Sequence, residues 1–89
     1  MATPSALAFR AVVVETAVAG RLRTVNTVRD AAEVLLYWPA EKRGDAWWNA
    51  CKAAHGALAG TLEPETARKA FVQAAMVAGI YVKEGDGRR

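Results

Sequence analysis

Residues 37–48 read YWPAEKRGDAWW and hold four of the chain's seven aromatic residues. Pro39 and Gly44 interrupt this stretch, because Pro lacks a backbone donor and Gly disfavours a helix. Helical spacing on both sides predicts two helices whose aromatic side chains meet in the core. The core residues expected from this arrangement are Leu35, Tyr37, Trp38, Trp47, Leu58 and Phe71.

The helix before this break is expected to begin at Thr27, whose hydroxyl stands three residues ahead of Asp30 in a capping arrangement. It ends near Trp38, since Pro39 disfavours helical geometry in the residue before it. Its apolar face is predicted to contain Val28, Ala31, Ala32, Leu35 and Trp38.

The helix after the break is expected to run from Glu41 or Asp45 to Ala59, with Gly60 as its terminator. Gly56 inside it should cost about 1 kcal/mol relative to Ala. Two neighbouring stripes follow from the spacing, one with Trp47, Cys51, Ala54 and Leu58, the other with Trp48, Lys52, His55 and Ala59. The first is more apolar, so Trp47 is the predicted core residue and Trp48 the more exposed one.

A third helix is signalled by Glu63-Pro64-Glu65, because Pro suits the first helical position and acids complement the helix dipole there. Gly79 followed by Ile80 indicates its end, and residues 80–82 then form a short strand. The predicted buried face holds Ala67, Ala70, Phe71, Ala74 and Ala78.

The N-terminal part of the chain predicts a β-hairpin. Residues 9–16 are rich in β-branched side chains, Gly20 supplies a turn, and residues 21–25 alternate in polarity. The pattern leaves open whether the face with Val12 and Val14 or the opposite face with Phe9, Ala11 and Val13 meets the helices.

These elements predict one α+β domain over residues 9–82, with the C-terminal strand beside the hairpin. Residues 1–8 are expected to be flexible, and the charged, Gly-containing segment 83–89 to be disordered. The chain is small, and 20 of its residues are Ala, which bring little apolar area to a core. Burial between subunits would compensate, so we expect a homodimer.

Charge and cysteine content bear on the location of the protein. The net charge of +3 is modest, and its basic bias is confined to the N-terminal third. A single Cys51 fits a reducing compartment, and the first residues lack a secretory pattern. The uncharged run 70–82 is shorter than the roughly 20 residues of a membrane span. The expected location is the cytoplasm, with no membrane contact.

The order of hairpin, helix, Trp-Pro break, helix with Cys, helix and Ala-Gly-Ile strand resembles a family of small bacterial proteins, domain-of-unknown-function family 982. The resemblance covers residues 9–82, and it implies the same α+β fold. No activity is assigned to this family, so the resemblance carries over no catalytic residue. The matching positions are Thr27, Trp38-Pro39, Gly44, Trp47, Ala50-Cys51, Gly60, Ala67-Arg68, Ala70-Phe71 and Ala78-Gly79-Ile80.

Cys51 and His55 stand four residues apart, so both side chains could reach one metal or form a nucleophile and its base. The chain holds no second Cys or His, and no third orienting group is evident in the sequence. A small buried thiol beside a polar His is the simpler interpretation. We therefore expect no enzyme activity, no metal and no cofactor.

Two other groups of residues predict partners. Trp48, Lys52 and His55 would form an interface on the outer stripe, although Trp48 could instead pack beneath the hairpin or the 39–44 loop. Arg10, Arg21 and Arg23 on the hairpin could contact phosphates. The sequence thus predicts a non-enzymatic interaction module that self-associates or binds an unidentified protein; the alternative is a small nucleic-acid-binding regulator.

Overall fold

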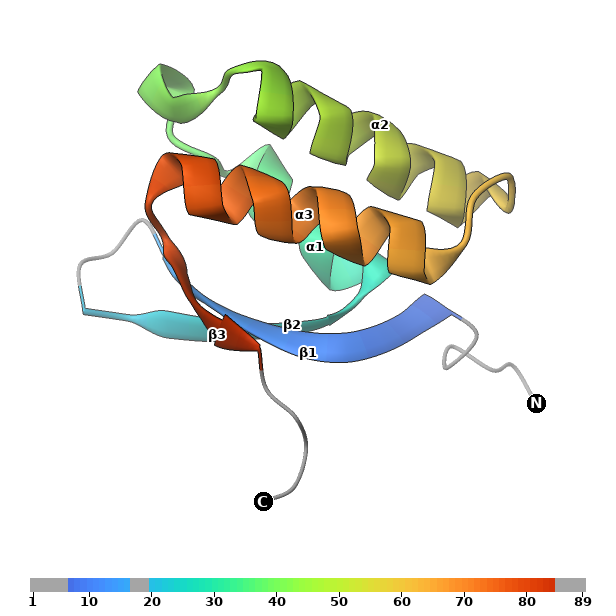
Figure 1. Cartoon of the computed structure of the whole chain (residues 1–89), viewed down its shortest axis with the longest axis horizontal. Helices are drawn as coiled ribbons and strands as arrows, with labels where there is room; N and C mark the ends of the chain where they lie inside the picture. The colour runs from blue at the N-terminus through green and yellow to red at the C-terminus, as the bar shows by residue number, and fades with distance from the viewer. Residues whose placement is uncertain (1–6, 17–19, 85–89) are drawn as a thin grey trace.

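The computed structural model describes residues 7–16 and 20–84. They form an antiparallel sheet, in the order β2-β1-β3, with helices on one side of it (Figure 1). The predicted α+β class, with an N-terminal hairpin, three α-helices and a C-terminal strand, is confirmed. The elements are β1 (Ala8–Glu15), β2 (Leu22–Thr27), α1 (Val28–Leu36), the 3-10 helix η2 (Ala40–Lys42), α2 (Asp45–Ala59), α3 (Pro64–Ala78) and β3 (Tyr81–Glu84).

The helices form two layers over the sheet. α1 packs on β2, and α3 packs on β1 and β3. α2 packs mainly on α3 and α1, and Figure 1 shows it on the far side of α3 from the sheet. The sheet therefore meets the helices through α1 and α3, whereas one side of α2 is left for other contacts.

The sheet register settles which hairpin face is covered. Val12 pairs with Val25, and both side chains are fully buried, as is that of Val14. The face with Val12 and Val14 therefore meets the helices. Phe9 lies within the segment between Ala8 and Val12 where the register shifts, and it also packs against the core. A β-bulge is the device that re-aims side chains in this way.

Local capping signals place the helix ends where the sequence predicts them. The Thr27 hydroxyl accepts a hydrogen bond from the Asp30 amide at 3.0 Å, which opens α1. Gly60 and Gly79 close α2 and α3 with φ of +87° and +78°, a region that favours Gly. The Ile80 amide then donates to the Ala75 carbonyl at 3.0 Å and directs the chain into β3.

The C-terminal strand is longer than expected. β3 continues to Glu84, so Lys83 and Glu84 belong to the sheet and not to a disordered tail. The charged composition of 83–89 gave no hint that Glu84 would find basic partners within the fold. At the other end, β1 begins at Ala8, one residue earlier than predicted. Residues 1–6, 17–19 and 85–89 lie outside the described part of the chain. The predicted flexibility of residues 1–6 and the predicted disorder of residues 85–89 therefore fall on residues that the structure does not describe.

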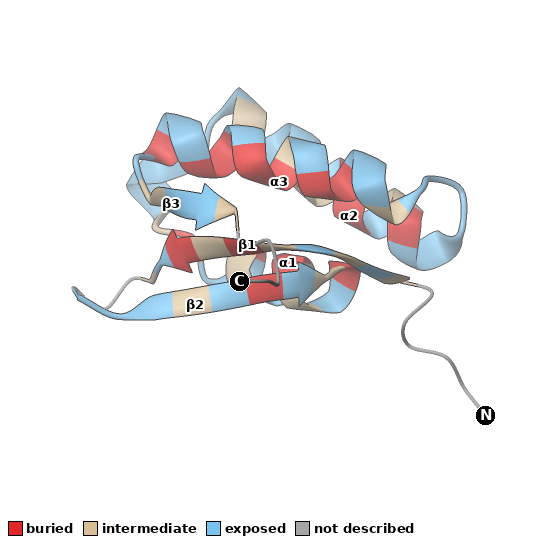
Figure 2. Cartoon of the chain, turned by 60° about the horizontal axis from the view of Figure 1, so that its bottom comes forward, coloured by how far each residue is buried: buried red, intermediate tan, exposed pale blue. Residues whose placement is uncertain are grey.

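The core confirms three of the predicted residues and corrects two. Leu35, Trp38 and Phe71 are buried, and Trp47 is partly buried against them. Tyr37 is 72% exposed because α1 ends at Leu36 and Tyr37 is only its cap. Leu58 is 43% exposed because α2 turns a different face to the core, as the burial colours of Figure 2 show for the helix layer. That buried face consists of Ala50, Ala53, Ala54 and Ala57.

Candidate functional site

An apolar groove of about 330 Å³ lies between α1 and α2, and we call it the α1–α2 groove. No Lys, Arg, Asp or Glu lines it among the described residues. Leu36 and Leu58, two of its wall residues, are 65% and 43% exposed, so much of its apolar surface faces solvent. The residues of its wall are Ala32, Leu35, Leu36, Trp47, Cys51, Ala54, His55 and Leu58.

Trp47 lines this groove, and Trp48 lies beside Trp47. Trp47 is fixed in the wall, because its indole Nε1 donates to the Leu35 carbonyl at 3.0 Å and the Arg43 guanidinium lies 4.9 Å from its ring centroid. The ring of Trp48 lies 6.2 Å from that of Trp47, and Trp48 is 55% exposed. Trp48 therefore stands at the margin of the groove, and it is the more exposed of the pair, as the sequence predicts.

Cys51 and His55 both line the groove, but their surroundings do not activate a thiolate. Burial raises the pKa of the Cys51 thiol, and the nearby positive charge of Arg43 opposes this only in part. A nucleophilic cysteine needs the opposite shift. Within residues 7–16 and 20–84, no three His, Cys, Asp or Glu side chains gather as metal ligands. His55 is exposed, as are Lys52 and Trp48, the other members of the predicted interface.

The hairpin arginines do not come together. Arg10 lies in the part of β1 beside Asn26 and Thr27, and its Nη2 is 2.6 Å from Glu84 Oε1. Arg23, near the turn, bonds to Glu33 at 2.8 Å and lies 3.4 Å from Asp30. Arg21 is exposed at the turn. Two of the three charges are thus already compensated, and nucleic-acid binding by this hairpin stays a prediction that these ion pairs disfavour.

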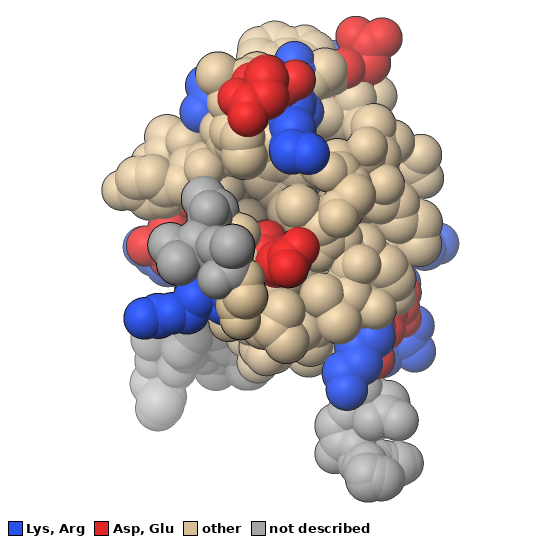
Figure 3. Space-filling model, turned by 90° about the vertical axis from the view of Figure 1, so that its left-hand side faces the viewer, with Lys and Arg blue, Asp and Glu red and all other residues tan. Residues whose placement is uncertain are grey.

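A second cavity, of about 520 Å³, opens at the end of the sheet next to the hairpin turn, and we call it the end cleft. Figure 3 faces this end of the molecule and shows acidic and basic side chains scattered over a largely uncharged surface, with one acidic group near its middle. Trp38 belongs to the wall and packs edge-on against Phe71, with ring centroids 6.1 Å apart. The wall consists of Glu15, Thr16, Arg23, Val34, Tyr37, Trp38, Pro39, Glu41, Lys42, Gly79 and Ile80.

Two basic residues of the 39–44 loop hold the cleft in shape. The Lys42 ammonium donates to the Ala78 carbonyl at 3.0 Å, at the C-terminal end of α3. The Arg43 guanidinium donates to the carbonyls of Trp38 at 3.0 Å and Leu36 at 3.1 Å, at the end of α1. Both cations satisfy carbonyls that a helix end leaves without partners. Sequence reasoning missed these two residues, because the carbonyls they cap are identified only by the fold.

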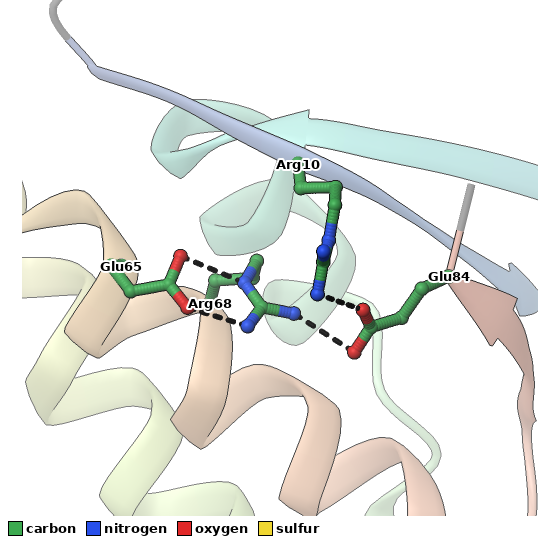
Figure 4. A network of polar contacts seen from close by, with 4 residues as sticks. All are labelled: Arg10, Glu65, Arg68 and Glu84. Atoms are coloured by element: carbon green, nitrogen blue, oxygen red, sulfur yellow. Dashed lines mark hydrogen bonds and ion pairs between the residues drawn. The ribbon is translucent and has the colours of Figure 1, made fainter. Parts of the chain in front are cut away.

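A network of four charged side chains closes the opposite end of the sheet (Figure 4). Arg68 is buried on α3 and bonds to both oxygens of Glu65 and, at 2.9 Å, to Glu84 on β3. Glu84 also binds Arg10 on β1. Hydrogen bonds from Arg68 lower the pKa of Glu65 and the pKa of Glu84. The same bonds raise the pKa of Arg68, and the bond to Glu65 contributes more than the bond to Glu84. The network therefore joins α3 to two strands.

The fold defines the class of protein: a small α+β domain with an apolar groove between two helices and a cleft at one end of its sheet. None of the helices in the described part is long and apolar enough to cross a bilayer. The family described as "Protein of unknown function (DUF982)" matches residues 10–82, so the chain belongs to this family, as its resemblance implied. No curated protein and no solved structure shows significant similarity to the chain.

Proposed function

We propose that this chain is a non-enzymatic interaction module that self-associates, with Trp48 of one copy entering the α1–α2 groove of another. The observation that carries the proposal is an uncharged groove whose wall residues Leu36 and Leu58 are exposed, with the exposed Trp48 beside the wall residue Trp47. Apolar side chains are normal singly on a surface, but a contiguous set around a groove is typical of an interaction site. Trp is also among the commonest residues to carry binding energy.

A second copy of the chain is the occupant that suits this geometry. Trp48 lies next to the groove on the same surface. Two copies related by a twofold axis can therefore each insert Trp48 into the groove of the other copy. The groove carries no charge that would have to be desolvated, and Lys52 is exposed outside its wall, so its charge can remain solvated at the rim of an interface.

The size of the domain favours association as well. A standard interface buries about 800 Å² per partner, which is about one seventh of the 5532 Å² that the described residues expose. The face of α2 inside the fold is made of alanines, which contribute little apolar area. We propose a cytoplasmic location, where Cys51 in the groove stays reduced. Association should then be independent of added reductant.

Sedimentation equilibrium from micromolar to submillimolar protein tests the proposal. The parent chain should dimerise, and Trp48→Ala should weaken the dimer about thirtyfold, which corresponds to about 2 kcal/mol for the two Trp48 side chains of the dimer together. Leu58→Glu should have at least this effect, because it places a charge in the groove. The matched control is Val77→Glu, which introduces the same charge at an exposed apolar position of α3 outside the groove.

A parent chain that stays monomeric over this range overturns the proposal. So does a Val77→Glu variant that dissociates as readily as Leu58→Glu, since the interface would then not be the groove. Circular dichroism of each variant at low concentration separates a lost contact from a lost fold.

A further inference from the structure

We infer that the end cleft binds a small organic cation with a flat apolar body. The inference is independent of the proposed self-association, because the cleft uses Val34 of α1 with Tyr37 and Trp38 just after it, whereas the groove uses Ala32, Leu35 and Leu36. The volume of about 520 Å³ lies in the range of small-molecule sites.

The apolar part of the wall suits a flat, compact group. Trp38 and Tyr37 contribute aromatic rings, and Val34, Pro39 and Ile80 complete the apolar surface. Trp38 is rigidly placed, since it is only 3% exposed and packs against Phe71. Binding against such a wall is favourable, because it removes the apolar surface of a hydrocarbon or aromatic ring from water. Aromatic faces also attract cations.

The charges of the cleft decide the sign of the ligand. Arg23 lines the cleft, but its guanidinium already faces the carboxylates of Asp30 and Glu33. Lys42 is held by the Ala78 carbonyl. Glu15 and Glu41 also line the cleft, and neither forms an ion pair with any residue that the structure describes.

The balance of these groups is negative. The wall itself holds two carboxylates, Glu15 and Glu41, and two bases, Arg23 and Lys42. Asp30 and Glu33 lie outside the wall and pair with Arg23, so these six groups together carry a net charge of −2 on a chain whose overall net charge is +3. Carboxylates without partners at the mouth of an apolar cavity favour a positive charge on the ligand. A primary amine attached to a ring or a short hydrocarbon chain is the simplest ligand with this chemistry.

Three probes of nearly the same shape test the inference: phenethylamine, phenethyl alcohol and phenylacetate. Each is titrated into isotopically labelled parent chain at low salt, and the indole N–H signal of Trp38 is followed by NMR after assignment with Trp→Phe variants. We expect phenethylamine to bind with a Kd on the order of 1 mM, as befits a fragment. The alcohol should bind more weakly, and phenylacetate most weakly of the three.

Two variants connect the binding to the carboxylates. Glu15→Gln and Glu41→Gln should each weaken phenethylamine binding about threefold and leave phenethyl alcohol unaffected. Glu63→Gln is the matched control, because Glu63 is the N-cap of α3, about 24 Å along the helix from Gly79. The effect of either variant should diminish with added salt.

Three results would overturn the inference. Phenylacetate could bind as tightly as phenethylamine, which would place the dominant charge on Lys42 or Arg23. Alternatively, none of the probes could shift the Trp38 signal at concentrations on the order of 10 mM. Finally, Glu15→Gln and Glu41→Gln could change phenethylamine binding no more than Glu63→Gln does.

Discussion

The two ends of the sheet use the same kinds of side chain in opposite ways. At one end, Arg68 and Arg10 share Glu84, and Glu65 completes a network in which each charge has a partner. At the other end, Arg23 is paired through α1, while Glu15 and Glu41 have no ion-pair partner among the described residues. α3 joins the two ends, since it begins beside the network and finishes at Gly79 in the wall of the end cleft.

The difference separates a stabilising role for charge from a binding role. A carboxylate that is hydrogen-bonded to a buried guanidinium stabilises the fold but has little capacity left for a ligand. A carboxylate without a partner contributes little to folding and keeps its capacity to bind. We therefore expect mutations of the network to change the stability of the fold, and mutations of Glu15 or Glu41 to change ligand binding with little effect on stability.

Trp38→Ala should produce the largest effect, because Trp38 belongs both to the core and to the wall of the end cleft. Its truncation should lower the free energy of unfolding by about 4 kcal/mol, the usual cost of deleting a buried aromatic side chain. Urea titration measures this. Trp48→Ala, compared in dilute protein, should cost less than about 1 kcal/mol; equal losses would contradict the assignment of Trp38 to the core.

Arg68→Ala should lower the free energy of unfolding by about 2 to 3 kcal/mol, because it leaves Glu65 and Glu84 without their buried donor. Lys69→Ala, at the next and exposed position, should change it by less than about 0.5 kcal/mol. Chemical denaturation of both variants makes the comparison. If they lose the same amount, the network does not stabilise the fold.

Acid should weaken the network end of the sheet in particular. Glu65 and Glu84 have pKa values below the ordinary 4.5. Their contribution to the free energy of unfolding is therefore complete above pH 4.5, and it is lost as the pH falls through their lowered pKa values. The parent should lose stability between about pH 5 and about pH 2. A double variant, Glu65→Gln with Glu84→Gln, should be less stable near neutrality and lose less on acidification. Thermal unfolding across this range checks the sign.

The smallest effect is expected at the cleft. Glu15→Gln and Glu41→Gln should each change the free energy of unfolding by less than about 0.5 kcal/mol, with a gain as reasonable as a loss, since each removes a charge that has no partner. Glu84→Gln is the same chemical change at the network end and should cost about 1 kcal/mol. Similar costs at both ends would remove the distinction between them.

Much of the fold was predictable because its signals are local. Thr27, Gly60 and Gly79 mark helix ends through bonds to residues only a few positions away. Leu58 was misplaced because spacing defines a helical stripe without saying which stripe faces the core, and Tyr37 because α1 ends at Leu36 and leaves Tyr37 as its exposed cap. Gly56 looked only costly, but a Cβ there would stand 2.7 Å from Leu62 Cδ1, so the loop after α2 packs where a side chain would be.

The candidate sites were harder to predict, since their members are distant in sequence. Trp48 and His55 could be identified because they lie on one helix with the groove residue Cys51. The cleft gathers residues from Glu15 to Ile80, and the partners Arg10 and Glu84 are 74 positions apart. The carboxylates of Glu15 and Glu41 looked like ordinary surface charges until the fold placed them beside Trp38. No local pattern contains that information.

The position of β1 at the centre of the sheet has a consequence for synthesis of the protein. Its two neighbours come from opposite ends of the chain, with β2 following at once and β3 only after α3. While the nascent chain is still on the ribosome, the side of β1 that β3 will cover is an open edge of Val-rich backbone, a template for aggregation. A stop codon before Tyr81 would make that exposure permanent, so such a fragment should accumulate as insoluble protein.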